Sequence, residues 1–262
     1  MGDEAPDAAP QPNAAARARG RSLGDFTELT SAERRLIDAC RQGEVCDLGA
    51  SRPETVSADR KIDARLVRFL ALGGDRSTPV HEKGVRLQGA WLDGVLDLDN
   101  CEPGRPIRLT NCRIEAISAD GAQVPALLIE SSLLEGGLNA SRLVCKGDLL
   151  LGRENFSAGD LVCLHGAEIG TLICDGEFAG KPKSTKGAPE RMAIDLSGAT
   201  IHGDLQLATQ IKGWVDLHGA DVAGNLVCVG GRFDNAGGYA LVCDHIKVTG
   251  NVFLNDRFHP TS

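Results

Sequence analysis

An 11-residue repeat runs through most of residues 84–254, and it constrains the fold more than any other feature of this chain. When the segments VRLQGAWL, LDLDNCEP and IRLTNCRI are aligned, Leu87, Leu98 and Leu109 fall at intervals of 11. Apolar residues continue this spacing further along the chain, at intervals of 11, 10 and 11: Leu196, Leu207, Leu217 and Cys228. A repeat this short indicates a solenoid, in which each unit packs only on its neighbours.

Each repeat unit contains two runs of about three residues that alternate inward and outward, and each run is followed by a turn rich in Gly, Asn or Asp. Such runs are stable only when each pairs with the equivalent run one coil away. If one unit turns the chain by half a circuit, a coil takes about 22 residues. The chain holds 32 Gly and only ten aromatic residues, which suits a thin core of small aliphatic layers. We therefore predict an all-β fold, a right-handed parallel β-helix behind a short α-helical N-terminal region.

A longer duplication lies over the short repeat. Residues 146–178 match residues 202–233, and residues 249–258 begin a third copy. Between the copies, the polar segment GKPKSTKGAPER at 180–191 interrupts the apolar positions and is predicted to leave the solenoid as an inserted loop. Four cations of this loop are candidate contacts for a partner: Lys181, Lys183, Lys186 and Arg191.

Three regions follow from these patterns. Residues 1–22 are rich in Ala, Pro and Arg with almost no large apolar side chain, a composition typical of a disordered tail. Residues 23–78 contain two stretches with apolar side chains at helical spacing, and we expect them to form a helical cap region. Residues 79–262 are predicted to form the parallel β-helix.

The two cap helices have recognisable limits. The first can begin at Thr30 or Ser31, either of which suits an N-cap, and it is predicted to end at Gly43. The second is predicted over residues 59–72, which end at a pair of glycines. Such helices would cover the first coil, whose apolar cross-section and unpaired backbone groups otherwise face water.

Charge and composition exclude several classes of protein. The net charge of -8 and the pI near 5.3 argue against direct nucleic-acid binding, which requires a basic face. No run of 18 apolar residues is present, so we expect no transmembrane segment, and the start MGDEAPDAAP is unlike a secretory signal. These features predict a soluble, cytoplasmic protein. Neither a Gly-x-Gly-x-x-Gly nor a Cys-x-x-Cys motif is present, so no cofactor is predicted.

Three phrases of the sequence resemble a family of mainly actinobacterial repeat proteins: IDARLVRFLALGGD, KGVRLQGAWLDGVLDLDN and GDLLLGRENFSAGDLVCLHGAEIGTLIC. Many members carry the label membrane-associated oxidoreductase. The resemblance covers most of residues 27–258 and implies a β-helix related in style to pentapeptide-repeat proteins. We take from it the fold and not the redox activity, because the chain holds no motif with a redox mechanism.

His165 and His218 occupy equivalent repeat positions, in CLHGAEIG and DLHGADVAG, and are expected to point outward. Stacked imidazoles can bind a metal ion. Equal repeat position explains their recurrence as well, and 53 residues separate them, so we expect them to lie more than one coil apart. They are weak metal candidates, and no metal site is predicted.

Acidic residues recur at another repeat position, where each follows Gly and precedes Leu: Asp148, Asp160 and Asp204. Paired carboxylates on a β-helix face can cleave glycosidic bonds. Asn225 and Asn251 take the same place, which favours turn chemistry, because either side chain accepts hydrogen bonds from nearby backbone N–H groups. No catalytic residue is therefore assigned, and we lean against an enzyme.

The nine cysteines are predicted to be reduced, and most fall where the repeat elsewhere places aliphatic residues. Five are assigned to inward positions: Cys112, Cys145, Cys174, Cys228 and Cys243. Cys163 instead aligns with Asp216 and is expected to face solvent. It is the candidate for a reactive thiol.

The last predicted coil has no capping helix, so its apolar residues Phe253, Leu254 and Phe258 are candidate interface residues. Our leading hypothesis is a non-catalytic scaffold that binds a protein, or a second copy of itself, through this coil or through flat faces. One alternative is a DNA mimic that regulates a DNA-binding enzyme, as in pentapeptide-repeat proteins that protect gyrase. Another is an enzyme with a groove on the β-helix for a carbohydrate or other small substrate.

Overall fold

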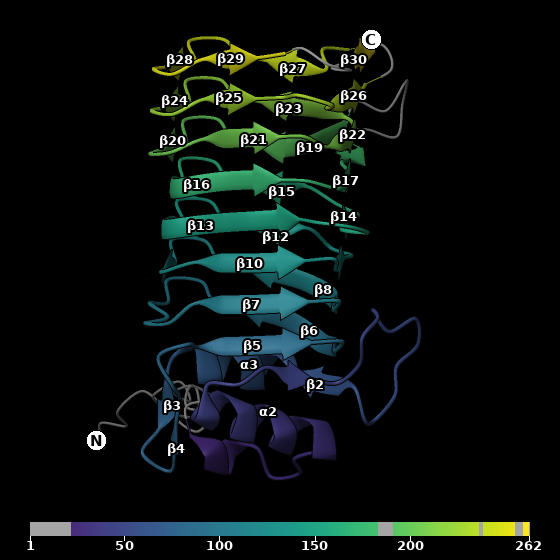
Figure 1. Ribbon diagram of the computed structural model, residues 1–262, viewed down its shortest axis with the longest axis vertical. Helices are drawn as coiled ribbons and strands as arrows, with labels where there is room; N and C mark the ends of the chain where they lie inside the picture. The colour runs from purple at the N-terminus through teal and green to yellow at the C-terminus, as the bar shows by residue number, and fades with distance from the viewer. Residues whose placement is uncertain (1–21, 183–190, 236–237, 255–258, 262) are drawn as a thin grey trace, which may run out of the picture.

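The computed structural model describes residues 22–182, 191–235, 238–254 and 259–261, and these form a β-solenoid of about 7 coils on a helical cap (Figure 1). Successive coils lie about 22 residues apart in sequence, as the repeat predicts. In Figure 1 the near strands run from left to right while the chain climbs away from the cap, so the coil is right-handed. The predicted parallel β-helix is confirmed. The predicted disordered tail falls on residues 1–21, outside the described part of the chain, and on Ser22.

Two sheets contain most of the described strands. The first sheet comprises β1 (Cys46–Asp47), β5 (Val85–Gln88), β7 (Ile107–Thr110), β9 (Gln123–Val124), β10 (Leu127–Glu130), β13 (Val144–Gly152), β16 (Glu168–Cys174), β20 (Thr200–Ile201), β21 (Leu205–Leu207), β24 (Asp221–Val222), β25 (Leu226–Val227), β28 (Lys247–Val248) and β29 (Val252–Phe253). The second comprises β2 (Lys61–Asp63), β6 (Trp91–Asp97), β8 (Arg113–Ser118), β11 (Leu133–Leu134), β12 (Leu138–Asn139), β14 (Ser157–Ala158), β15 (Val162–Cys163), β17 (Glu177–Ala179), β18 (Lys181–Pro182), β19 (Arg191–Asp195), β22 (Gln210–Lys212), β23 (Trp214–Asp216), β26 (Arg232–Asp234), β27 (Leu241–Val242) and β30 (His259–Thr261). A hairpin of β3 (Gly74–Asp75) and β4 (Thr78–Pro79) and a 3-10 turn, η1 (Leu23–Asp25), belong to the cap.

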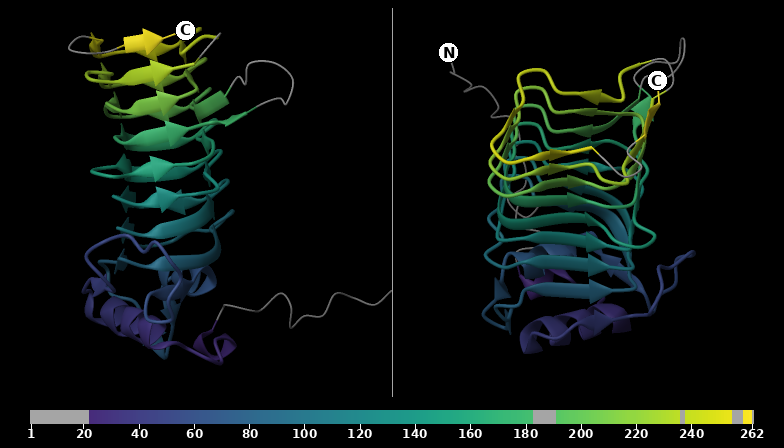
Figure 2. Two further views of the ribbon diagram at one scale, coloured as in Figure 1. Left: turned by 90° about the vertical axis from the view of Figure 1, so that its right-hand side faces the viewer. Right: turned by 45° about the horizontal axis from the view of Figure 1, so that its top comes forward.

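Strand pairing shows how two repeat units complete one coil. Leu87 pairs with Leu109, and Leu109 pairs with Ile129, so these side chains stack in adjacent coils. Between Leu127 and its partner Leu149, the chain passes through β10, β11, β12 and the first part of β13. A coil therefore has four short sides, and the corners stack above one another (Figure 2).

Inward side chains form columns that exclude water. One column of the first sheet consists of residues that are each at most 1% exposed: Leu87, Leu109, Ile129, Leu151, Cys174 and Leu207. Burying an aliphatic side chain of this size contributes about 1.5–3 kcal/mol. Phe156 and Phe178 fill one corner, with ring centroids 5.4 Å apart. The solenoid is thus held by a continuous apolar core.

The helix α2 (Ser31–Gln42) begins and ends at the predicted signals. Thr30 is the N-cap: its hydroxyl accepts from Glu33 N at 3.1 Å, while the Glu33 carboxylate accepts from Thr30 N at 2.8 Å. Gly43 ends the helix in the left-handed conformation, with φ 69°. The other oxygen of Glu33 accepts from Asp63 N at 3.0 Å and so ties α2 to the start of the next helix.

The second helix is shorter than predicted: α3 spans Ala64–Ala71 instead of residues 59–72. The preceding residues form β2, which pairs with β6 and buries Ile62 completely. Asp63 is the N-cap, because its carboxylate accepts from Arg65 N at 2.8 Å. Strand pairing therefore begins within the predicted cap region, where β1 also pairs with β5. No helix in the described part of the chain is long and apolar enough to cross a membrane.

Residues 48–60 form a strap that leaves the cap and follows one corner of the solenoid (Figure 1, lower right). Three hydrogen bonds attach it to three different coils: Arg60 Nε to Gly89 O at 2.7 Å, Asn111 Nδ2 to Ala50 O at 2.9 Å, and Arg52 Nη1 to Asn155 O at 3.0 Å. The strap thus joins the cap to a coil more than 100 residues away in sequence.

The predicted insertion begins and ends in a short ladder. Strand β18 pairs antiparallel with the start of β19, so that Lys181 lies opposite Met192. Arg191 is the first residue of β19. Two of the candidate loop contacts lie outside the described residues: Lys183 and Lys186.

Candidate functional site

The candidate thiol Cys163 and the candidate metal ligand His165 lie on one corner of the solenoid. The structure brings them together with three residues that the sequence did not single out: Ser141, Asp195 and Ser197. Cys163 ends β15 and pairs with Asp195, which ends β19 in the next coil. We call these five residues the polar row.

Hydrogen bonds connect the polar row into a chain. Cys163 Sγ lies 3.3 Å from Ser141 Oγ and 3.9 Å from Asp195 Oδ2. Ser197 Oγ donates to Asp195 Oδ1 at 2.5 Å, and His165 Nδ1 lies 2.9 Å from Ser197 Oγ. Because the single Ser197 proton goes to the carboxylate, the imidazole is the donor in its contact with Ser197. In a Ser-His or Cys-His nucleophilic site the roles are reversed, because the imidazole accepts the proton of the hydroxyl or thiol.

The same aspartate position stabilises the turn in several coils. Asp195 Oδ1 accepts from Ser197 N at 3.0 Å, and Asp216 Oδ1 accepts from His218 N at 2.9 Å. An aspartate that accepts from the backbone N–H two residues later forms an Asx turn. The polar row is therefore built from turn-forming residues, and its geometry favours a structural role.

The two candidate metal ligands are not brought together. Ser197 holds the position equivalent to His165 in the next coil, and His218 follows one coil further on. The ring of His218 instead lies edge-on to His245, with centroids 5.5 Å apart. In the ranges that the structure describes, no group of three or more His, Cys, Asp or Glu residues is arranged to hold a metal ion.

The recurrent Asp and Asn side chains accept backbone hydrogen bonds, but Asp160 does so locally, whereas Asp204 and Asn225 accept from the equivalent residue of the next coil. Asp204 Oδ1 accepts from Asn225 N at 2.7 Å and from Asn225 Nδ2 at 3.0 Å. In the next coil, Asn225 Oδ1 accepts from Asn251 N at 2.9 Å. Asp160 Oδ1 accepts from the N–H of the residue that follows it, at 2.7 Å. Asp and Asn alternate here because both supply the same acceptor.

Four of the five cysteines assigned to the core are buried: Cys112, Cys145, Cys174 and Cys228. Burial raises the pKa of the Cys145 thiol to about 11 and that of each of the other three to about 12. Cys243 is exposed, contrary to its assignment. It follows Val242, the partner of Asp216, and so stacks on the buried Leu217, but no further described coil covers it.

Three consecutive apolar side chains are exposed on the last described coil: Val252, Phe253 and Leu254 are 51%, 41% and 46% exposed. In the coil below, the amides of Leu226 and Cys228 donate upward, to Asn251 O at 2.9 Å and to Phe253 O at 2.9 Å. The equivalent N–H groups of Val252 and Leu254 have no acceptor among the described residues. The third candidate interface residue, Phe258, lies outside the described part of the chain.

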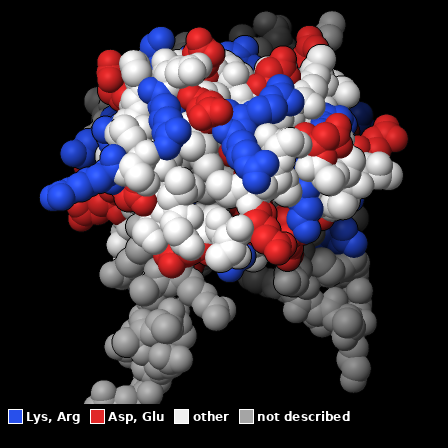
Figure 3. Space-filling view, turned by 90° about the horizontal axis from the view of Figure 1, so that it is seen from below, with Lys and Arg blue, Asp and Glu red and all other residues white. Residues whose placement is uncertain are grey.

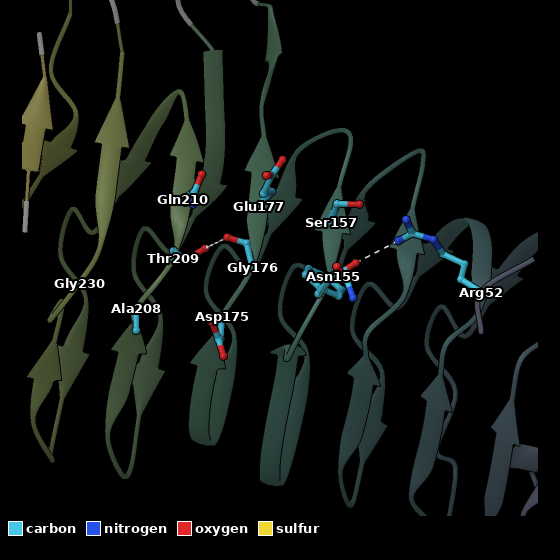
Figure 4. A pocket seen from close by; sticks show the side chains of 11 residues that line it. Arg52, Asn155, Ser157, Asp175, Gly176, Glu177, Ala208, Thr209, Gln210 and Gly230 are labelled. Atoms are coloured by element: carbon cyan, nitrogen blue, oxygen red, sulfur yellow. Dashed lines mark hydrogen bonds between the residues drawn. The ribbon is translucent and has the colours of Figure 1, made fainter. Parts of the chain in front are cut away.

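A groove of about 470 Å³ lies beside the corner that the strap follows (Figure 4). Its hollow shape arises because successive coils place small residues there: Gly176, Ala208 and Gly230. The side chains of Asp175 and Ala208 lie on one side of the turns, and those of Glu177 and Gln210 lie on the other. The sequence did not predict the groove, because the groove forms where residues are small and where the strap, a segment distant in sequence, contacts the coils.

Two hydrogen bonds fix the walls of this groove. Arg52, from the strap, donates to Asn155 O at one end. Thr209, which is 3% exposed, donates its hydroxyl proton to Gly176 O at 2.6 Å. Glu177 lies 3.6 Å from the ammonium group of Lys212. The groove is thus a preformed polar surface with charges of both signs.

Comparison of the chain with models of known protein families, with curated proteins and with solved structures finds no match. The resemblance to the actinobacterial repeat family therefore stays a prediction.

Proposed function

We propose that this protein is a non-catalytic β-solenoid scaffold that binds another protein through its last described coil, and that one such partner is a second copy of itself. The observation that carries the proposal is the exposure of core positions in that coil. Val252 stacks on Leu226, which is 3% exposed, but Val252 itself is 51% exposed. An open apolar column beside unpaired strand donors favours strand addition by another chain.

A second copy supplies the matching chemistry. Its last coil offers the same apolar column. A strand added from that copy would lie at the usual distance between neighbouring strands, about 4.8 Å. Two copies related by a two-fold axis place identical patches against one another and close the assembly at two chains. The outward Phe253, an aromatic side chain of a type common in interfaces, then lies at the margin of the buried patch.

The polar row supports a scaffold in preference to an enzyme, because His165 donates to Ser197 and is not placed to accept the proton of the hydroxyl or the thiol. DNA mimicry requires an unbroken acidic face. The longest run of stacked carboxylates among the described residues lies near the cap, at Asp63, Asp93, Glu115 and Glu135. Arg65, Lys61 and Arg113 neutralise three of the four. The cap end likewise presents cations and anions side by side (Figure 3).

We also propose a cytoplasmic location. All nine cysteines are unpaired, which suits a reducing compartment. Burial raises the pKa of six of them to about 11 or 12, so these six are neutral thiols at physiological pH. These residues stabilise the fold as small apolar side chains.

Light scattering over a concentration series tests the interface. We expect a mass near 27.6 kDa in dilute solution and twice that mass at high concentration. Val252→Glu places a charge on the open column and should leave the chain monomeric. Val56→Glu is the matched control, because Val56 lies in the strap and is 53% exposed. A wild-type chain that stays monomeric throughout would refute self-association, and a Val252→Glu variant that still dimerises would refute the last described coil as the interface.

A further inference from the structure

The groove at the strap corner continues into a second hollow on the same face. This neighbour has a volume of about 220 Å³ and is lined by Lys212, Arg232 and Asp234. Gln210 lines both hollows. We call the two together the edge groove. The first hollow reaches across four successive coils, from Asn155 to Gly230, so its long direction follows the solenoid axis.

Outward side chains from successive coils stack across the edge groove, and we call these stacked side chains rungs. Ser157 pairs with Glu177, Glu177 with Gln210, and Gln210 with Arg232, so one polar side chain stands on each of four successive coils. The rungs therefore repeat at the strand spacing of about 4.8 Å. A ligand that follows the groove must itself be extended and must present hydrogen-bonding groups at a similar repeat.

The charges of the edge groove balance. Three carboxylates and three cations line it: Asp175, Glu177 and Asp234, and Arg52, Lys212 and Arg232. A strongly anionic ligand meets the carboxylates, and a strongly cationic one meets the guanidinium and ammonium groups. A neutral ligand gains hydrogen bonds to both kinds of group without either repulsion.

Several lining groups have free hydrogen-bonding capacity. In the described part of the chain, the side chains of Asp175 and Gln210 make no hydrogen bond or ion pair with another residue. A carboxylate accepts at two oxygens, and a primary amide both donates and accepts. Adjacent hydroxyl groups of a sugar ring can engage such planar groups in pairs, as donor to the carboxylate and as both donor and acceptor to the amide.

We propose that the edge groove binds a neutral oligosaccharide in an extended conformation, with about one sugar residue for each coil that it crosses. Two features exclude an extended peptide as the favoured occupant. The strands of the groove, β14, β17 and β22, are paired on both sides and offer no free edge for a peptide backbone. The small residues of the floor form no apolar pocket for a side chain.

The groove binds without cleaving. Glycosidases need two carboxyl groups that flank the scissile bond, one of them protonated. Asp175 and Glu177 stand two residues apart, with side chains on opposite sides of the same turn (Figure 4), and Glu177 already lies 3.6 Å from the ammonium group of Lys212. This proposal is independent of the interface on the last coil.

NMR titration of the full chain tests it, with cellohexaose and xylohexaose as neutral probes. An acidic oligogalacturonide, spermine and a neutral Gly-Ser peptide are the comparison ligands. We expect shifts for residues of the edge groove with the neutral sugars, and an affinity about three- to tenfold weaker in Gln210→Ala, which removes one pair of hydrogen bonds. Asp175→Ala should weaken binding similarly. Gln123→Ala is the matched control, because Gln123 is exposed on β9, away from the groove.

The outcomes separate clearly. Binding of a neutral hexasaccharide that weakens in Gln210→Ala and Asp175→Ala, but not in Gln123→Ala, supports the proposal. The proposal is overturned if neither neutral sugar binds at millimolar concentration. It is also overturned if Gln210→Ala, Asp175→Ala and Gln123→Ala all bind the sugar with the same affinity. Groove shifts produced only by the oligogalacturonide, by spermine or by the peptide would also overturn it. The solution mass is expected to stay the same in the groove variants, which distinguishes this test from that of the interface.

Discussion

Val252 stacks directly on Leu226 across the last two described coils, yet Leu226 is 3% exposed and Val252 is 51% exposed. The two residues hold the same position of the repeat and have similar side chains. The difference arises from their neighbours, because Leu226 is covered from above and Val252 is not. Position in the stack, and not residue type, therefore decides which aliphatic residues form the core and which are available to a partner.

Truncating a covered core residue should be costly. Leu151 is completely buried between Ile129 and Cys174, so Leu151→Ala leaves a cavity that the neighbouring coils cannot fill. We expect the free energy of unfolding to fall by about 2–5 kcal/mol. Urea unfolding measures it, with Leu72→Ala as the control, since Leu72 is 39% exposed. Equal losses in the two variants would contradict the stacked-column account.

The buried Glu33 joins the two cap helices, because it accepts from Thr30 N at the start of α2 and from Asp63 N at the start of α3. Glu33→Ala removes both acceptors and leaves two N–H groups without them. We expect a loss of about 2–4 kcal/mol in unfolding free energy. Glu28→Ala, at an exposed position beside the same helix, should change it by less than about 0.5 kcal/mol. A similar effect of both changes would exclude the bridging role.

Stability should fall at alkaline pH through the buried thiols. Burial raises the pKa of Cys174 from an ordinary 9.0 to about 12, so the folded state keeps a proton that the unfolded chain loses above pH 9. The contribution is complete below pH 9 and declines by up to about 1.4 kcal/mol per pH unit between 9 and 12. Between pH 8 and 10.5, Cys174→Val should lose about 2 kcal/mol less than the wild type in urea unfolding. Identical losses would argue against a buried neutral thiol.

Thiol labelling should follow exposure. Cys243 is exposed and Cys163 is half-buried, whereas Cys112 and Cys174 are completely buried. A maleimide at neutral pH should therefore modify Cys243 first and Cys163 next in the native protein. Mass spectrometry of peptides identifies the labelled sites. Early labelling of Cys112 or Cys174 without denaturant would be incompatible with this packing.

The solenoid could be predicted from the sequence because its determinant is periodic. Leu87 and Leu109 are two repeat units apart and stack in adjacent coils, as a coil of about 22 residues requires. The start of α3 could not be placed by apolar spacing alone. Ile62 fits a helix face and a strand column equally well, and its pairing in β2 and the capping by Asp63 decided the outcome.

The corner and the groove depended on contacts that the repeat does not encode. The segment at 180–191 breaks the spacing, so the sequence did not reveal that Asp195 stacks beside Cys163. The groove depends on Arg52, which reaches Asn155 across 103 positions of sequence. Both features arise from interruptions of the repeat and from long-range contacts, and repeat alignment detects neither.

Amide hydrogen exchange of the last described coil tests the central claim most directly. The N–H groups of Val252 and Leu254 lack acceptors within the described chain, so they should exchange rapidly in dilute solution. Strand addition by a second copy would supply those acceptors. We predict that exchange at residues 247–254 slows as protein concentration rises, while exchange in β7 stays constant. Exchange at residues 247–254 that is independent of concentration, up to concentrations well above those used for light scattering, would contradict the account.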